Sequence, residues 1–249
     1  IQNSSGGHSV VWAEENSRDS IFAALKRKET YGTSGPRMLV RFFGGWDFSA
    51  EDCGRDFVKK GYEHGVPMGG DLRPNRRDKP APTFITAAWR DETNLEQIQI
   101  IKGWVEDGET KEKVYRVAGD AGSPFNAQQA VDPETCKAYP DRGSKLLCAA
   151  WEDPEFDPDQ HAFYYVRVLE EPVCRYSTLW CRERIGLDPL DTAQCQEDLA
   201  AWQQGTAEQR LKAAQGAKCC SDQLSVPFVQ PVIQERAWTS PIWYEPNSK

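Results

Sequence analysis

The chain has 249 residues, of which 39% are hydrophobic and 27% are charged, a composition typical of folded globular proteins rather than of disordered ones. Its formal net charge of −8 argues against nucleic acid as the main partner, because phosphate binding requires a positive field. No apolar run approaches the roughly 18 to 20 residues of a membrane-spanning helix, so we expect no membrane span.

Residues 1–36 predict a short strand followed by one amphipathic helix. The strand is GGHSVVWA, and Asn16 is the expected N-cap of the helix. The segment GTSGP then supplies the stop signals that end the helix. The apolar stripe of the helix consists of Ile21, Phe22 and Leu25. A strand and a helix cannot bury both apolar faces alone, so we expect this unit to pack against a preceding part of a longer protein.

From residue 37 onward the pattern changes from helix to strand. Six segments are rich in β-branched and aromatic residues: 37–43, 83–89, 97–105, 112–118, 145–151 and 162–170. The Asp-Gly pair in VEDGET predicts a hairpin between the third and fourth segments. The connections are too short for crossover helices, so we expect antiparallel strands in a sandwich. The fold class is then α+β and mainly β, with residues 37–249 as a β-rich domain.

Two long connections interrupt the strands. Residues 44–82 form a stretch without a clear element, and a loop of that length is usually functional. A cysteine-rich insertion with two helices is predicted at about residues 186–230. Thr206 and Gln209 form a capping box at the start of its second helix. Extended chain follows in PVIQERAWTSPIWYEP.

Cysteine usage favours disulfides over a zinc site or reduced buried thiols. The chain has eight cysteines, no CxxC spacing and only three histidines. The cysteines are Cys53, Cys136, Cys148, Cys174, Cys181, Cys195, Cys219 and Cys220. Spacing favours Cys136 with Cys148 and next Cys174 with Cys181, although sequence alone does not fix the pairing. Disulfides imply an oxidising compartment, so we expect a periplasmic or secreted protein.

No complete active site is visible in the residues. Motifs such as GxSxG, HxH and HExxH are absent from the sequence. Gly69 and Gly70 permit a close backbone approach that could direct Asp71 into a cleft, or they form only a tight turn. Arg37 and Trp46 are further weak candidates for substrate contacts, and His8 is a weak candidate metal ligand. The nine tryptophans could include a stacking platform for sugars, although aromatic residues at strand spacing usually belong to the core.

The acidic stretch EDPEFDPDQH superficially resembles a calcium loop, because its carboxylates alternate from Asp153 onward. An EF-hand loop requires glycine at its sixth position, where Pro158 stands. We therefore interpret the stretch as Asp-Pro turns before a strand.

Several long strings resemble the bacterial family called domain of unknown function 3604. They are GGHSVVWAEENSRDSIFAALKRKETYGTSGPRMLVRFFGGWDF, GVPMGGDL, QIQIIKGWVEDGETKEKVYRVAGD, DPEFDPDQHAFYYVRVLEEPVCRYST and IQERAWTSPIWY. The resemblance implies a longer parent, in which residues 1–36 are the last strand–helix unit of a polymerase and histidinol phosphatase (PHP) type barrel. It also implies that the upstream barrel binds divalent metal, such as manganese or zinc, through His and Asp motifs that this chain lacks. Members of the family usually carry an export signal.

Two functional hypotheses follow. The first is the carboxy-terminal portion of an exported metal-dependent hydrolase of phosphate or related esters, with no metal bound by this chain alone. Its partners are a small-molecule ester and the upstream barrel, and Asp71, Gly69, Gly70, Arg37 and Trp46 contact the substrate. The alternative is a non-catalytic β-sandwich module that binds glycan or protein at the cell surface.

Overall fold

The computed structural model describes residues 6–74, 80–119, 131–225 and 230–246. The chain forms two compact units, each described by itself. The sheet unit comprises residues 7–121, 143–170 and 236–249, and the helical unit comprises residues 1–6, 122–142 and 171–235.

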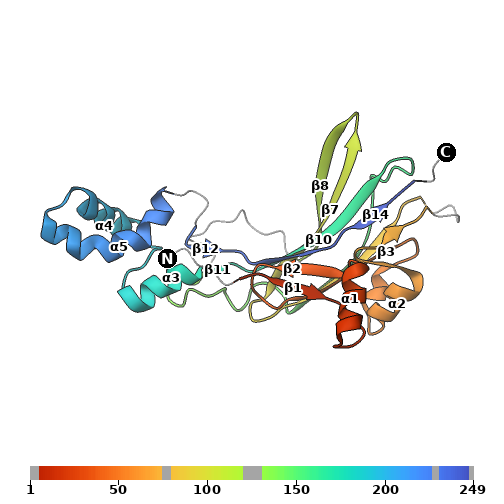
Figure 1. The fold of residues 1–249 in the computed structure, drawn as a ribbon, viewed down its shortest axis with the longest axis horizontal. Coiled ribbons are helices and arrows are strands. Elements are labelled where there is room, and N and C mark those ends of the chain that lie inside the picture. Colours follow the sequence, from red (N-terminus) through yellow and green to blue (C-terminus); the bar gives the residue numbers. More distant parts are fainter. Residues whose placement is uncertain (1–5, 75–79, 120–130, 226–229, 247–249) are drawn as a thin grey trace. The chain divides into compact units, whose positions relative to one another are not determined.

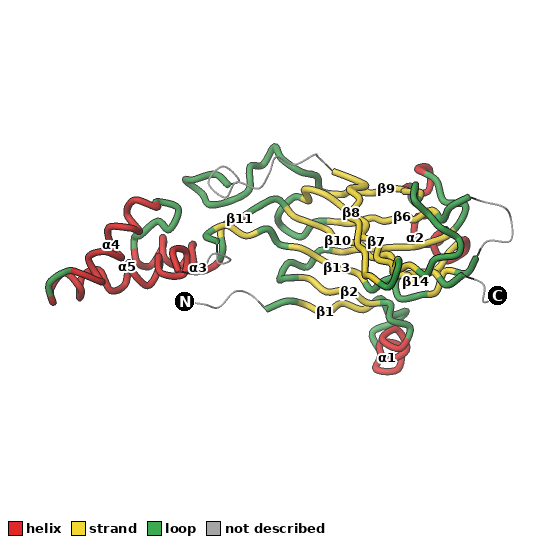
Figure 2. Tube along the Cα trace, turned by 90° about the horizontal axis from the view of Figure 1, so that it is seen from above, coloured by secondary structure: helices red, strands yellow, loops and turns green. Residues whose placement is uncertain are grey.

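The sheet unit contains two β-sheets, shown in Figures 1 and 2. The strands of the eight-stranded sheet are β1 (His8–Val11), β2 (Thr30–Thr33), β5 (Asp71–Leu72), β7 (Leu95–Glu106), β8 (Glu109–Gly119), β10 (Ala162–Glu170), β13 (Arg236–Thr239) and β14 (Ile242–Tyr244). The strands of the four-stranded sheet, in order, are β4 (Gly65–Pro67), β3 (Leu39–Gly45), β6 (Thr83–Trp89) and β9 (Leu146–Glu152).

Strand β10 organises the larger sheet. It pairs with β7 along one edge, and with β13 and β14 one after the other along the opposite edge. Strand β2 joins β13, β1 joins β2, and β8 joins β7. Figure 2 shows β1, β2, β13 and β10 side by side. These pairs are antiparallel, whereas β5 lies parallel to β14. The prediction of a mainly β, α+β protein with antiparallel sheets is therefore confirmed.

One apolar core lies between the two sheets. Strand alternation directs every second side chain of each sheet into this core. Buried members from the smaller sheet are Val40, Phe42, Phe84 and Ala88, and those from the larger sheet include Ile98, Ile100, Tyr164, Val166, Ala237 and Ile242. The face of the larger sheet that points away from this core is called the outer face below.

The β7–β8 hairpin confirms the predicted Asp-Gly turn. Asp107 and Gly108 both have positive φ, 52° and 78°, as a two-residue hairpin turn of the type I′ family requires. The turn matches the twist of the strands, and the two strands pair from Glu106–Glu109 to Gln97–Gly119, with one register shift between Ile98 and Gln99 (Figure 1).

The first helix, α1 (Arg18–Lys26), differs from its prediction at both ends. Ser17, not Asn16, is the N-cap, and its hydroxyl accepts a hydrogen bond from the Ser20 amide at 3.3 Å. The helix ends at Lys26, and Thr30–Thr33 forms β2, where the end of the helix and its stop signals were predicted. Strand β2 pairs with β13, about 200 residues later, and no local pattern reveals such a partner.

Residues 7–36 lie in the same compact unit as the strands that follow. Val10 and Trp12 pack against the shared core, and Ala24 is buried. Phe22 and Leu25 of the predicted apolar stripe, in contrast, are 61% and 51% exposed.

A buried carboxylate fixes the chain after α1. Glu29 accepts a hydrogen bond from the Tyr62 hydroxyl and lies 3.4 Å from Arg41 Nη1. The Arg41 guanidinium in turn stacks 3.5 Å above the Trp12 ring. These contacts join the segment that follows α1 to the smaller sheet.

Residues 44–82 contain more structure than the predicted long loop. A 3₁₀ turn, η1 (Ala50–Cys53), and a helix, α2 (Phe57–His64), lie within them. Phe48 and Phe57 pack on Phe43, Ile85 and Ala87, and so cover part of the smaller sheet on its side away from the shared core. The disulfide Cys53–Cys148 links η1 to β9 at the same place.

The helical unit contains two helices within the predicted insertion, and it begins earlier in the chain than that insertion. Its elements are β11 (Val173–Cys174), α3 (Tyr176–Trp180), a π-helical turn η2 (Cys181–Ile185), α4 (Thr192–Gln204), α5 (Ala207–Ser225) and β12 (Val232–Ile233). Thr206 and Gln209 exchange the two predicted capping hydrogen bonds. None of the described helices is long and apolar enough to cross a membrane.

All eight cysteines form disulfides, as predicted, but both favoured pairings were wrong. The bonds are Cys53–Cys148, Cys136–Cys174, Cys181–Cys219 and Cys195–Cys220. Cys136 belongs to the helical unit and Cys148 to the sheet unit, so their closeness in sequence does not bring them together. Cys174 lies on β11 and bonds to Cys136, which leaves Cys181 free to reach α5.

Candidate functional site

A row of five residues crosses the outer face of the larger sheet. The residues are aligned on five neighbouring strands, in the order Asp71 (β5), Trp243 (β14), Phe163 (β10), Gly103 (β7) and Glu112 (β8). Aligned partners in a sheet place their side chains on the same face, so the row runs from one carboxylate through two aromatic rings to another carboxylate.

Strand alternation places the two aromatic side chains of the row on the outer face. Their chain neighbours Ile242 and Tyr164 are buried in the shared core, whereas the Trp243 side chain is 41% exposed. The ring centroids of Phe163 and Trp243 lie 5.2 Å apart. Tyr165 extends the aromatic surface along β10, with its ring stacked on Phe163 at 6.4 Å.

Gly103 explains why Phe163 lies low over the sheet. A Cβ atom at this position would collide with the Phe163 ring, so only glycine leaves the space that the ring occupies. The ring therefore covers the glycine backbone and forms a floor between β10 and β7.

A pocket of about 540 Å³ lies over four residues of this row, from Trp243 to Glu112, and Asp71 lies just beyond its lining. It has the size of a small-molecule site. Its lining includes the outer-face aromatic residues Phe163 and Trp243 and the polar residues Thr110, Lys111, Glu112, His161 and Glu245. Trp104 and Tyr244 also belong to the lining, but both pack against the shared core. All of these residues belong to the sheet unit.

The charges at the pocket are mainly negative. Glu112 and Glu245 have no ion-pair partner within the described part of the chain. Lys111, which also lines the pocket, pairs with Glu109 at 2.7 Å. Burial, and then the charge of Glu112, raises the pKa of Tyr165, which agrees with Glu112 lying on the same face.

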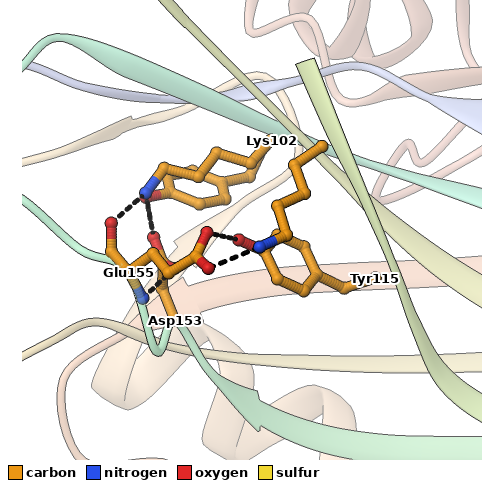
Figure 3. A network of polar contacts seen from close by, with 6 residues as sticks. Lys102, Tyr115, Asp153 and Glu155 are labelled. Carbon is orange, nitrogen blue, oxygen red and sulfur yellow. Dashed lines mark hydrogen bonds and ion pairs between the residues drawn. The ribbon is translucent and has the colours of Figure 1, made fainter. Parts of the chain in front are cut away.

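A buried ion pair supports the strands from the core side (Figure 3). Lys102 is 3% exposed, and its ammonium donates to Asp153 Oδ2 and to the Glu155 carbonyl oxygen, both at 2.7 Å. The Tyr164 hydroxyl donates to the same Asp153 oxygen at 2.7 Å. Burial, followed by the charge of Asp153, raises the pKa of Tyr164. The ammonium also lies 5.5 Å from the ring of Trp104, a pocket residue.

Glu155 extends this network toward the β7–β8 hairpin, as Figure 3 shows. Its carboxylate accepts hydrogen bonds from Lys113 Nζ and from the Tyr115 hydroxyl. The hydrogen bond from Lys113, and next that from Tyr115, lowers the pKa of Glu155. The segment between β9 and β10 is thus tied to two strands that carry the pocket.

The same contacts bear out the interpretation of EDPEFDPDQH as turns. The Asp153 and Asp157 carboxylates accept hydrogen bonds from the amides of Glu155 and Asp159, two residues later in each case. Asp153 is occupied by Lys102 and Tyr164 rather than directed toward an open cation site.

The predicted Gly69–Gly70–Asp71 stretch leads directly to the row. Gly69 has φ of +87°, its amide donates to the Pro241 carbonyl at 3.0 Å, and a Cβ there would collide with the Lys28 backbone. The Trp243 amide donates to the Gly70 carbonyl at 3.0 Å. Both glycines therefore hold β5 beside β14, and this places Asp71 next to Trp243.

The remaining predicted residues occupy different places. Trp46 packs on Phe156 and Tyr244, and its Nε1 donates to the Arg73 carbonyl at 3.1 Å, so it anchors the chain just after β5. Arg37 precedes β3 and Trp46 follows it, so about 20 Å of strand separates them. The structure does not bring Arg37 to the row.

His8, the candidate metal ligand, is an exposed residue of β1 aligned with Thr33. Among the residues that the structure describes, no three His, Cys, Asp or Glu side chains form a group that could hold a metal ion. No metal-dependent step is assigned to the described residues.

Sequence reasoning did not identify Trp243, Phe163, Glu112 or Glu245 as pocket residues. One signal was present, because Phe163 and Tyr165 alternate with the buried positions of β10. Their neighbours across the sheet come from segments up to about 170 residues apart, and this register is visible only in the structure.

Comparison with known proteins gives one match. The family model described as Protein of unknown function (DUF3604) matches residues 1–203. No curated protein and no solved structure matches the chain.

Proposed function

We propose that this chain, which belongs to the DUF3604 family of proteins of unknown function, provides a non-catalytic domain that binds a saccharide on its outer-face aromatic row. The observation that carries the proposal is the alignment of Trp243 and Phe163 under a pocket of about 540 Å³, with a carboxylate at each end of the row.

The chemistry of a pyranose ring matches this arrangement. One face of the ring presents C–H groups, which pack on the electron-rich face of an aromatic side chain. The hydroxyl groups at the ring edge donate hydrogen bonds, and the carboxylates of Asp71 and Glu112 can accept them. Because residue 103 is glycine, the Phe163 ring lies close to the sheet and leaves room above it for a sugar ring.

The test is saccharide binding by the whole chain, measured by isothermal titration calorimetry with a panel of soluble oligosaccharides. Trp243→Ala removes the larger stacking surface, and we expect it to weaken binding at least about ten-fold, the effect of losing about 1.4 kcal/mol. Trp238→Ala is the matched control. Trp238 lies on the same face and is 37% exposed, but it is aligned with Arg167 and does not line the pocket.

Two results would contradict the proposal. One is a panel in which no saccharide binds at millimolar concentration. The other is equal loss of binding in both tryptophan variants, because a nonspecific apolar surface would behave in that way.

A second candidate function is metal-dependent hydrolysis of phosphate or related esters by an exported protein of which this chain is the carboxy-terminal part. The observation that favours it is the exposure of Phe22 and Leu25 on α1, next to β1 at the edge of the larger sheet. Exposed apolar side chains of this size are suited to contact with another domain. In this proposal, that domain is a PHP-type barrel that supplies the metal ligands, and the four disulfides suit export to the periplasm or beyond.

This second candidate is tested by expressing the chain with and without the upstream region of its gene. Hydrolysis of p-nitrophenyl phosphate and of a diester is assayed with manganese or zinc added. We expect activity in the longer product alone. A longer product that is inactive on a broad ester panel and binds no metal would exclude this candidate and leave the binding domain unaffected.

A further inference from the structure

We infer that the saccharide bound at the aromatic row carries a protonated amine, so the ligand class is an amino sugar rather than a neutral or acidic sugar. This inference rests on the proposed saccharide-binding function. The inference comes from the charged side chains at the pocket, because the aromatic rings alone do not specify the charge of the sugar.

Three carboxylates surround the aromatic floor. Glu112 and Glu245 line the pocket, and Asp71 ends the row beside Trp243. None of the three is engaged in an ion pair with another residue in the described ranges. Each therefore keeps its negative charge available to a ligand.

The positive groups at the pocket do not balance these charges. The Lys111 ammonium is 2.7 Å from Glu109 Oε2, and this pair is neutral as a whole. His161, an exposed side chain, is the other lining group that can become positive. A neutral sugar would leave the carboxylates without a counter-charge, an acidic sugar would be repelled, and an ammonium group would be attracted.

The aromatic residues favour the same charge. The face of an aromatic ring is electron-rich and attracts cations, most strongly for tryptophan. Trp243 and Phe163 can therefore stack on the sugar ring while also favouring an ammonium substituent at its edge. A carboxylate and an aromatic face together form a site for a cationic sugar.

The experiment measures binding of four oligosaccharides of equal length at pH 6 by calorimetry. They are a glucosamine oligomer, its N-acetylated counterpart, a neutral glucose oligomer and a galacturonic acid oligomer. This pH lies above the ordinary pKa of carboxyl groups, so the carboxylates are ionised, and it is low enough for most glucosamine amines to carry a proton. We expect the glucosamine oligomer to bind most tightly and the galacturonic acid oligomer most weakly. The difference in affinity between them should shrink as salt is added, because salt screens the charges.

The variants Glu112→Gln and Glu245→Gln test the carboxylates directly. Each should weaken glucosamine-oligomer binding roughly two- to five-fold, the range of a solvent-exposed ion pair, and leave neutral-sugar binding unchanged. Glu109→Gln should act in the same direction, because it frees the Lys111 ammonium to oppose the ligand. Glu92→Gln, an exposed carboxylate in the turn after β6, is the control and should have no effect.

The outcomes separate this inference from the function on which it rests. If saccharides bind through Trp243, but the N-acetylated and cationic oligomers bind equally and the glutamine variants have no effect, the amino-sugar inference alone fails. If no saccharide binds, or Trp243→Ala changes nothing, the saccharide-binding function fails as well. Binding of oligolysine with the same dependence on Trp243, without saccharide binding, would also overturn both and indicate a basic peptide ligand.

Discussion

Lys102 is the residue whose burial most constrains the sheet unit. Its ammonium, 3% exposed, has exchanged water for Asp153 and a backbone carbonyl. Removing one partner of a buried pair leaves the other charge uncompensated, and this usually costs more than the pair itself contributes. The pair therefore fixes how the segment before β10 lies against β7.

We predict that Lys102→Met lowers the free energy of unfolding by about 3 kcal/mol, because Asp153 remains buried without its counter-charge. The matched control is Lys113→Met, which removes an exposed ion pair with Glu155 and should lower the free energy of unfolding far less. Urea denaturation followed by tryptophan fluorescence measures both. Equal losses in the two variants would show that the burial of Lys102 has no energetic consequence.

Gly69 is the second residue with a specific conformational role. Its φ of +87° disfavours any residue with a Cβ, and that Cβ would also meet the backbone of Lys28. Gly108 has a similar φ of +78°, but a Cβ there would face open space. Substitution at Gly108 therefore tests backbone strain alone, whereas substitution at Gly69 adds a collision.

Gly108→Ala should therefore lower the free energy of unfolding by about 1 kcal/mol, the cost of left-handed backbone for a residue with a side chain. Gly69→Ala should lower it by about 2 kcal/mol more, because backbone atoms must move to accept the methyl group. Chemical denaturation of both variants gives the comparison. A Gly69→Ala variant as stable as Gly108→Ala would mean that β5 can shift away from α1 at little cost.

At the scale of elements, η1 and α2 are joined by a salt bridge. Lys60 Nζ lies 2.7 Å from Asp52 Oδ1, and Asp52 also accepts from the Ser49 amide at 2.8 Å. The hydrogen bond from Lys60, and next that from Ser49, lowers the pKa of Asp52 below its ordinary value of 3.8.

This shift has a defined sign for stability. A carboxylate with a lowered pKa in the folded state stabilises the fold above its ordinary pKa, and the stabilisation is lost as the pH falls through the folded-state pKa. We predict that Asp52→Asn is slightly less stable than the parent chain at pH 7, and that the difference shrinks as the pH falls from about 3.8 through the lower folded-state pKa. Thermal unfolding across pH 2 to 7 measures it. A difference that grows as the pH falls would have the wrong sign for this mechanism.

The elements also show what sequence reasoning reaches and what it does not. Segments 83–89 and 162–170 were predicted with the bounds that β6 and β10 have, because alternation and β-branched residues are local signals. Strand β2 and the disulfide pairings were not predicted correctly, because their partners lie far along the chain. For the same reason Asp71 could be proposed as a site residue, whereas its neighbour Trp243 could not.

At the scale of the whole molecule, the two units depend on different sources of stability. The sheet unit has a large apolar core that includes Phe42, Phe84 and Tyr164. The described clusters of the helical unit are small, and cysteines make up a large part of them, with Val131, Val232 and Leu187 among the other buried members. A unit with so little apolar burial relies on its cross-links.

We predict that reduction with dithiothreitol unfolds the helical unit first, because Cys136–Cys174, Cys181–Cys219 and Cys195–Cys220 all lie within it. The sheet unit should remain folded and keep its saccharide binding, although loss of Cys53–Cys148 lowers its stability. Limited proteolysis with mass spectrometry locates the cleavage sites. Cleavage that begins in the described strands of the sheet unit would contradict this division.

The position of β13 between β2 and β10 has a consequence for how the molecule is assembled. The antiparallel pair of β1 and β2, with α1 between them in the chain, joins the larger sheet through residues 236–239 of β13. A chain emerging in order therefore cannot join β2 to the larger sheet until residues 236–239 have emerged, about 200 residues after β2, and a protein cut before residue 236 could not complete the sheet.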